Sequence, residues 1–379
     1  MEIVKSNGNN CVGKAPTTII LAGAGASVQL GYPTLDDLMQ RAIIGNDDTA
    51  DLIREVRNSI HVKKYQTAVF EEMIVKIKDY IRTTEMLRTD HVMRKEVGQV
   101  SNEITNGRVE TKFKEALVRC FQVLIDSYGP DKIHKDSKEF YFTIALLEAL
   151  AQKNGDLHIY TTNYDCTYQF LGSNCGSLAF MSHISNVDGN FQEMLWYYMN
   201  AKLENADIPK VFIHRLHGCI AWFNHTDIDG GAGYVNEWFG AGGDLHVPID
   251  QLSSMCIKLL ASQLSGTNRA FASAFDEFSQ HLRDIDNLII WGYSFRDLEV
   301  TRQINQALIT RNRPFNLFYI DPFLTEYAAK NNFITTLRNA PVPIYGDFAP
   351  KQIHWTPPDG YQCLIDILLE ITTKGETKC

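Results

Sequence analysis

The sequence has no CxxC pair among its eight cysteines, which are Cys11, Cys120, Cys166, Cys175, Cys219, Cys256, Cys363 and Cys379. This spacing supports neither a zinc ribbon nor a small disulfide framework. No apolar run approaches the roughly 18 residues that a membrane span needs. Residues 1–16 are polar and contain no apolar signal core. Scattered thiols without an export signal indicate a cytoplasmic protein.

Positive charge is in deficit, because 36 Lys and Arg stand against 45 Asp and Glu, for a net charge of −9. We therefore expect no broad nucleic-acid surface and no direct nucleic-acid binding. Only 21% of the 379 residues are charged and 45% are hydrophobic, which is enough to bury a substantial core. The length fits two or three compact units, or one large α/β domain with insertions.

The first patterned segment is an apolar run, residues 17–22, that breaks into a glycine turn at 23–27. It predicts a buried strand and a tight turn. Thr34 then has the position of a helix cap with Asp37 three residues on. The helical spacing that follows is carried by Leu35, Leu38, Met39 and Ala42.

From residue 46 to 152 the periodicity is helical throughout, which predicts a helical subdomain inserted after the first strand and helix. Gly98–Arg108 is its expected loop. Two apolar stripes are typical of core or of a subunit interface. They consist of Phe70, Met73, Ile74, Ile77 and Ile81, and of Phe113, Ala116, Leu117, Cys120, Phe121 and Leu124.

Strand signals return after the insert, with helical patterns between them. They cover residues 157–162, 210–216, 286–292 and 314–321. This alternation predicts an α/β fold with a Rossmann-like parallel sheet covered on both faces. The expected organisation is the first part of the sheet domain at 1–45, the helical insert at 46–152, the rest of the sheet domain at 153–350 and a C-terminal helical segment at 351–379.

Polar or glycine clusters follow the strands, at 161–165, 216–218, 292–294, 319–321 and 345–347. Ligands of doubly wound sheets bind at the carboxyl ends of strands, so these clusters predict one crevice. The turn at Gly23 and Gly25 would let a backbone approach a pyrophosphate. The next glycine is Gly31, however, which is later than the usual dinucleotide spacing.

This ordered set of motifs resembles the sirtuin family, which cleaves the nicotinamide bond of NAD. The resemblance runs from about Thr17 to Phe348, interrupted by the insert. The family's Gly-Ala-Gly-x-Ser loop, Gly-x-Pro, Thr-x-Asn-x-Asp, His-Gly and later Gly-x-Ser are matched by Gly23–Ser27, Gly31–Pro33, Thr161–Asp165, His217–Gly218 and Gly292–Ser294.

The resemblance implies that Asn163 orients the nicotinamide ribose and an attacking water, and that His217 is the general base on ribose hydroxyls. It implies an NAD-binding set of Gly23, Ala24, Gly25, Ser27, Pro33, Thr162, Asp165, Gly292, Ser294, Asp321, Gly346 and Asp347. Nicotinamide is a good neutral leaving group, so the chemistry needs a strained pose, excluded water and local electrostatics, and we expect no metal.

Each of these residues also has a structural interpretation. His217 fits a satisfied histidine at the end of a strand, and Asn163 fits a turn residue that bonds nearby backbone. Ser27 fits a cap of the next turn, any of Ser294, Arg296 and Asp297 fits a cap of the helix that follows them, and Asp321 before a proline fits a turn.

Two departures separate the chain from deacetylating sirtuins. After Pro33 the sequence continues Thr34-Leu35-Asp36, where those enzymes have Asp-Phe-Arg. Their two zinc-binding CxxC pairs are also missing, since only Cys219 and Cys256 occur between His217 and Gly292. Water is then the simplest acceptor, which gives nicotinamide and ADP-ribose.

This combination is similar to sirtuin-like effectors of bacterial antiviral defence, which drain NAD in abortive infection. The resemblance implies a homo-oligomer that is silenced by a partner, either a HerA-type hexameric translocase or, alternatively, a short argonaute or another infection sensor. Two other functions stay open: an NAD-dependent protein deacylase, and a non-catalytic scaffold that binds NAD or ADP-ribose.

Overall fold

The computed structural model of the protein describes residues 18–60, 69–97, 101–129, 132–185, 191–195, 208–225, 234–237, 255–257, 269–293, 295, 297–311, 315–321 and 348–354. The strands are β1 Thr18–Ala22, β2 Leu157–Thr161, β3 Ala179–Ser185, β4 Phe191–Leu195, β5 Lys210–Arg215, β6 Gly218–His225, β7 Tyr234–Glu237, β8 Met255–Ile257, β9 Asn287–Trp291, β10 Phe315–Asp321 and β11 Phe348–His354. The helices are α1 Ala24–Val28, α2 Leu35–Ile43, α3 Asp48–Asn58, α4 Val69–Thr89, α5 His91–Val97, α6 Asn102–Thr105, α7 Arg108–Tyr128, α8 Lys138–Asn154, α9 Thr167–Asn174, α10 Arg269–Asp284 and α11 Leu298–Thr310.

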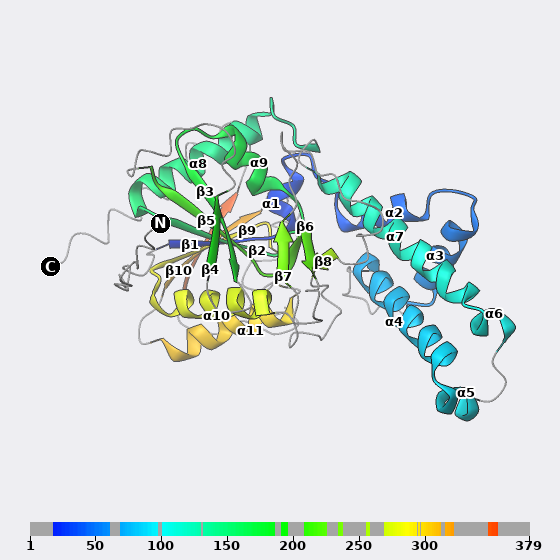
Figure 1. Cartoon of the computed structure of the whole chain (residues 1–379). Coiled ribbons are helices and arrows are strands. Elements are labelled where there is room, and N and C mark those ends of the chain that lie inside the picture. Colours follow the sequence, from blue (N-terminus) through cyan, green and yellow to red (C-terminus); the bar gives the residue numbers. More distant parts are fainter. Residues whose placement is uncertain are drawn as a thin grey trace, which may run out of the picture.

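One large sheet, in the order β11-β10-β9-β1-β2-β5-β3-β4, forms the centre of the molecule (Figure 1). Its pairings from β11 to β3 are parallel, while β4 joins β3 antiparallel. The chain builds outward from β1 through β2 on one side and then returns through β9 on the other. The predicted doubly wound parallel sheet is therefore confirmed, and its strand order reverses between β1 and β9.

The sheet is covered on both faces, and the alternation of side chains along β1 shows why. Ile20 and Ala22 belong to the core on the side of α8 and α9, whereas Ile19 and Leu21 belong to the core under α10 and α11 (Figure 1). Successive side chains of a strand point to opposite faces, so a strand buried on both faces has a continuous apolar sequence.

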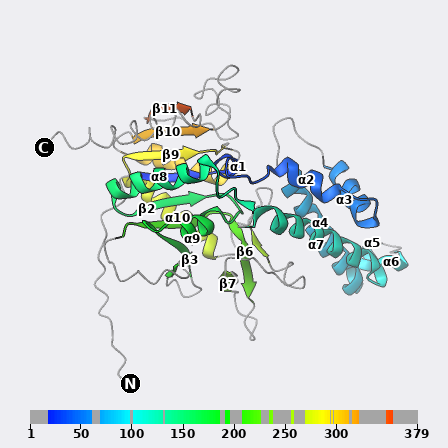
Figure 2. The same ribbon diagram turned by 90° about the horizontal axis from the view of Figure 1, so that it is seen from above.

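The helices α2, α3, α4 and α7 pack against one another in a group that projects from the sheet (Figure 2). Both predicted apolar stripes face its interior: Phe70, Met73, Ile74 and Ile77 are buried, as are Cys120 and Phe121. Ile81 and Phe113 are partly buried against the same core. We call residues 35–129 the helical unit. The later helix α8 packs on β2 of the sheet instead.

Local signals explain where several elements begin. The predicted cap at Thr34 is confirmed, since its side chain and that of Asp37 form a reciprocal capping box on α2. The segment Gly98–Arg108 differs from the expected loop. It contains α6, because the Ser101 side chain accepts a hydrogen bond from the Ile104 backbone N–H.

The chain after His217 enters a second, three-stranded antiparallel sheet, in the order β7-β6-β8. Residues 351–354, expected to begin a helical segment, belong to β11, and the expected C-terminal helix lies outside the described residues. Among the helices that the structure describes, none combines the length and apolar character needed to cross a membrane.

A buried hydrogen bond joins the helical unit to the segment after β2. Tyr164 Oη donates to Glu71 Oε1 of α4 at 2.9 Å, and the two side chains are 5% and 3% exposed. Burial raises the pKa of Tyr164 well above its ordinary value, and the Glu71 carboxylate raises it further. The phenol therefore stays protonated and keeps donating.

Replacing Tyr164 by Phe should lower the free energy of unfolding by about 1–3 kcal/mol, because the buried Glu71 carboxylate loses a donor. Chemical denaturation measures this loss. Tyr141→Phe is the matched control, since Tyr141 is 61% exposed and its change should stay within about 0.5 kcal/mol. Equal effects of the two variants would contradict the importance of this contact.

Candidate functional site

The loops that follow β1 and β9 touch backbone to backbone where the strand order reverses. Gly23 N donates to Trp291 O and Gly25 N donates to Gly292 O, both at 2.9 Å. Gly292 has a φ of +58°, and a Cβ there would lie 2.2 Å from Ala26 N. A Cβ on Gly23 or Gly25 would likewise lie 2.7–2.8 Å from the backbone of Gly292 and Tyr293. Only glycines allow this approach.

Asn163, which follows the neighbouring strand β2, forms hydrogen bonds to the loop that contains Gly23. Its Nδ2 donates to Gly23 O and to Ser27 Oγ, each at 2.8 Å. The Ser27 hydroxyl also accepts from Thr167 Oγ1 at 3.3 Å. Asn163 and Ser27 are 6% and 3% exposed. A predicted nucleotide-loop serine and a predicted catalytic asparagine are thus in direct contact.

Arg215, the last residue of β5, is bonded to the backbone of the segment that carries Asn163. Its side chain is fully buried, and its Nη1 donates to the backbone oxygens of Asn163 at 3.4 Å and Asp165 at 3.1 Å. The Asp165 carboxylate accepts from Thr167 N at 3.0 Å, which organises the turn into α9. Arg215 therefore fixes the backbone that carries Asn163 and Asp165.

His217, two residues after β5, pairs with a carboxylate from another element. Its Nε2 is hydrogen-bonded to Asp297 Oδ2, and the two residues are 2% and 6% exposed. The other oxygen of Asp297 caps α11, accepting from Glu299 N at 2.8 Å and Val300 N at 3.2 Å. The positive end of the α11 dipole stabilises this carboxylate, which holds the imidazole in one orientation.

The positions of Asn163 and His217 are linked through the strands and through Tyr293. Leu216 N donates to Thr161 O at 2.9 Å, so the segments after β2 and β5 leave the sheet side by side. Tyr293, which contacts the Gly23 loop, donates through its hydroxyl to Asp297 O at 3.5 Å. Burial raises the pKa of Tyr293 well above its ordinary value, so this phenol stays a donor.

The end of the helical unit contacts the segment after β2 and the loop that contains Pro33. Cys166 N donates to Tyr128 O at 3.2 Å, and Tyr128 Oη donates to Pro33 O at 3.3 Å. Tyr32 Oη donates to Gly129 O at 3.1 Å. The long helix α7 therefore ends on the segment after β2 and on the loop that contains Pro33.

The remaining predicted site residues lie as follows. Ala24 is the exposed first residue of α1, and Thr162 is half-buried with its N–H on Ala22 O at 3.1 Å. Asp321 ends β10 opposite His354. Ser294, Gly346 and Asp347 lie outside the described residues, and the strand after Asp347 begins at Phe348 opposite the first residue of β10.

Sequence reasoning missed two residues of this arrangement. Arg215 carried one signal, a cation at the end of an otherwise apolar strand, where it must find buried acceptors. Asp297 was identified only as a possible helix cap. Its second role, as the hydrogen-bond partner of His217, depends on the packing of α11 beside the end of β5, which no local sequence pattern shows.

No protein-family model matches this sequence, and a search of curated proteins finds no match. Among solved structures, the chain is similar to a Sir2 homologue in complex with NAD, at 12% identity and a TM-score of 0.40, over 94% of this chain and 90% of that one. It is also similar to a mutant Sir2 homologue in complex with ADP-ribose, at 12% identity and a TM-score of 0.37, over 96% and 94%. The identities and TM-scores are too low to assign an activity to this chain.

Replacing Gly292 by Ala should cost about 3 kcal/mol or more in unfolding free energy, because the new methyl overlaps the backbone of the Gly23 loop. Gly107→Ala is the matched control. Its φ is also positive, at +77°, but its nearest neighbour would be 3.6 Å away, so only the backbone cost of about 1–2 kcal/mol remains. Equal losses in denaturant titrations would show that the close approach of the loops is unimportant.

Proposed function

We propose that this chain is an NAD glycohydrolase that cleaves NAD to nicotinamide and ADP-ribose at the carboxyl ends of β1, β2, β5 and β9. The observation that carries the proposal is that Asn163 bonds to the glycine contact at the reversal of strand order, while His217 is linked to the same contact through Asp297 and Tyr293. This is where doubly wound sheets bind nucleotides. The resemblance of the motifs to sirtuins names the nucleotide as NAD.

In this proposal each polar side chain of the site has a separate role in NAD cleavage. Asn163 orients the nicotinamide ribose and the attacking water. As the water oxygen bonds to the ribose carbon that nicotinamide leaves, the water loses one proton, and His217 takes up this proton by way of a ribose hydroxyl. Asp297 acts as a positioning residue, because its carboxylate fixes the imidazole and stabilises the imidazolium that forms. Gly23, Gly25 and Gly292 let the backbone come close to the dinucleotide. Asp165 lies near the carboxamide, and Ser294, Asp321, Gly346 and Asp347 are proposed contacts of the phosphates and adenosine.

Water is the proposed acceptor of the ADP-ribosyl group. The sequence lacks the CxxC pairs that accompany acyl-lysine recognition in deacetylating sirtuins, and the segment after His217 continues into β6 of the small antiparallel sheet. Among the described residues, no group of cysteines is placed to hold a metal ion. Hydrolysis is therefore favoured over protein deacylation.

The burial of the site supports an enzyme that must open before it acts. Asn163, Asp165 and His217 are each 6% exposed or less. The helical unit is bonded to the segment after β2 and to the loop that contains Pro33, so a partner that displaces the unit changes the positions of both. We propose a cytoplasmic antiviral effector that works as a homo-oligomer and is controlled by a HerA-type translocase.

Asn163→Ala and His217→Ala should each reduce nicotinamide release from NAD by about 10²–10⁴-fold, because each removes a group that acts on the ribose or the water. Chromatographic measurement of nicotinamide, with and without the activating partner, checks this. Asn102→Ala and His91→Ala change the same residue types at exposed positions of the helical unit and should retain full activity. Full turnover by both site variants, with folding verified by circular dichroism, would disprove the site assignment.

Asp297→Asn separates the positioning role from the helix cap. Asparagine caps helices about as well as aspartate, so the stability should change by less than about 0.5 kcal/mol. The lost charge should lower kcat by about 10²-fold with little change in KM, because the imidazolium loses its partner. An unchanged kcat in the stably folded variant would exclude a role of Asp297 in the reaction.

A further inference from the structure

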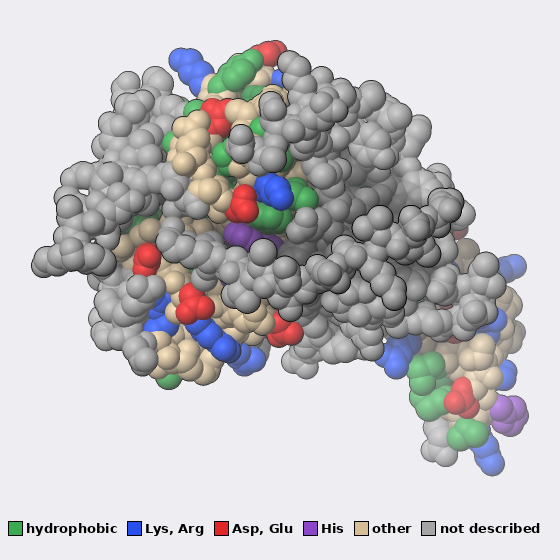
Figure 3. Space-filling view, turned by 60° about the vertical axis from the view of Figure 1, so that its left-hand side comes forward, with side chains coloured by type: hydrophobic (Ala, Val, Ile, Leu, Met, Phe, Trp, Pro, Cys, Tyr) green, Lys and Arg blue, Asp and Glu red, His purple; other side chains and the backbone are tan. Residues whose placement is uncertain are grey.

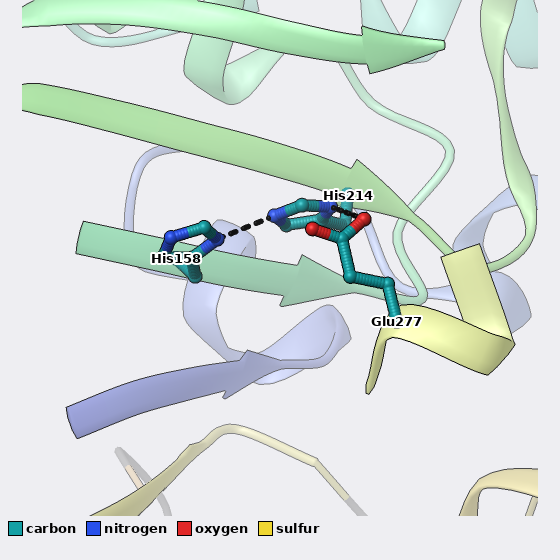
Figure 4. Close-up of side chains that lie close together, drawn as sticks. All are labelled: His158, His214 and Glu277. Carbon is teal, nitrogen blue, oxygen red and sulfur yellow. Dashed lines mark hydrogen bonds and ion pairs between the residues drawn. The ribbon is translucent and has the colours of Figure 1, made fainter. Parts of the chain in front are cut away.

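A second polar cluster lies on the α10 side of the sheet, apart from the glycine loops. It consists of His158 from β2, His214 from β5 and Glu277 from α10, which point toward one another (Figure 4). His158 Nδ1 and His214 Nε2 are 2.9 Å apart, and His214 Nδ1 lies 3.3 Å from Glu277 Oε2. Three side chains of ligand type from three separate elements therefore meet at one point.

Packing holds these side chains in place. The His214 ring is fully buried and stacks on Tyr160, with 4.4 Å between ring centroids and an interplanar angle of 17°. His158 stacks on Phe212 at 4.9 Å, and His281 meets it edge-on at 4.5 Å. Tyr160 Oη is in turn hydrogen-bonded to His281 Nδ1 at 2.7 Å. Such fixed rings lose little freedom when they bind an ion.

The cluster is open on one side. His158 is half-buried, and the Glu277 side chain is 19% exposed, so water has access to complete a coordination sphere. On the face drawn in Figure 3, histidine side chains reach the surface both in the sheet-bearing part and at the tip of the helical unit. The cluster of His158, His214 and Glu277 differs from an exposed histidine, because His214 is buried and the other two side chains are only partly in contact with water.

We propose that His158, His214 and Glu277 bind a divalent transition-metal ion, with zinc as the best match. One ligand atom from each residue lies within 4.8 Å of the others. Zinc bonds to nitrogen and carboxylate oxygen of about 2.0–2.2 Å place such atoms roughly 3.3–3.6 Å apart. One nitrogen of His214 would bind the ion, so its 2.9 Å contact with His158 must open slightly, while ligand atoms that lie farther apart move inward. Two imidazoles and one carboxylate suit zinc better than magnesium or calcium, which prefer oxygen ligands.

The site is independent of NAD cleavage but shares its strands. His158 and His214 belong to the two strands whose ends lead to Asn163 and His217. An ion that bridges β2, β5 and α10 stabilises this part of the sheet. Sequence spacing gave no sign of it, because the three ligands lie far apart in the chain and only the pairing of β2 with β5 brings the histidines together.

The test uses the full chain without a polyhistidine tag, stripped with a chelator and titrated with Zn²⁺ in a calorimeter. We expect one ion per chain and a rise in melting temperature with added Zn²⁺. Co²⁺ should give the visible absorption bands of a site with nitrogen and oxygen ligands. His158→Gln and Glu277→Gln should each weaken Zn²⁺ binding at least tenfold, whereas His91→Gln at exposed α5 should leave it unchanged.

Both site variants replace partly exposed side chains by neutral ones of similar size, so they should fold like the metal-free wild type in chelator. Circular dichroism verifies this before titration. Absence of stoichiometric Zn²⁺ binding by the wild type would overturn the proposal. So would binding that both site variants retain in full, since the cluster would then be only a hydrogen-bonded chain of side chains.

Discussion

The arrangement of this molecule depends on the contact between two glycine loops at the centre of the sheet. Gly23 and Gly25 approach Gly292 so closely that a single methyl group on Gly292 would lie 2.2 Å from a backbone nitrogen. This contact sets where β1 and β9 end relative to each other. Asn163 then bonds to Gly23 O in the loop after β1. On the other loop, Tyr293 donates to the backbone of Asp297, and the Asp297 side chain is hydrogen-bonded to His217.

Several residues therefore serve the fold and the proposed chemistry at the same time. The Asn163 amide crosslinks the segment after β2 to the loop after β1, and Asp297 both caps α11 and holds His217. Arg215 brings a buried cation beneath the segment that carries Asn163 and Asp165. Such shared roles restrict the orientations that each side chain can adopt in a site that is almost wholly buried.

The helical unit extends this arrangement away from the sheet. Its helix α7 runs from Arg108 at the far end to Tyr128, whose backbone and hydroxyl both bond to site segments. Glu71 of α4 adds a buried bond to Tyr164. A displacement of the unit must therefore break or move contacts of the segments that carry Pro33, Asn163 and Asp165.

Local patterns predicted much of this structure. The apolar strands, the capping box of Thr34 and the buried stripe around Phe70 follow from periodicity and residue type, which depend on near neighbours in the chain. The order of motifs also predicted that Gly23, Asn163 and Gly292 belong together. The partners Asp297 and Glu71 could not be predicted, because each meets its counterpart through the packing of elements that are distant in sequence.

The central claim is that this site transfers ADP-ribose from NAD to water. The most direct measurement is mass spectrometry of the products after incubation of the protein, alone and with the proposed partner, with NAD in water labelled with heavy oxygen. The account predicts nicotinamide and ADP-ribose in equal amounts, with one labelled oxygen atom in the ADP-ribose. NAD that stays intact although it binds tightly, or ADP-ribose without the label, would contradict it.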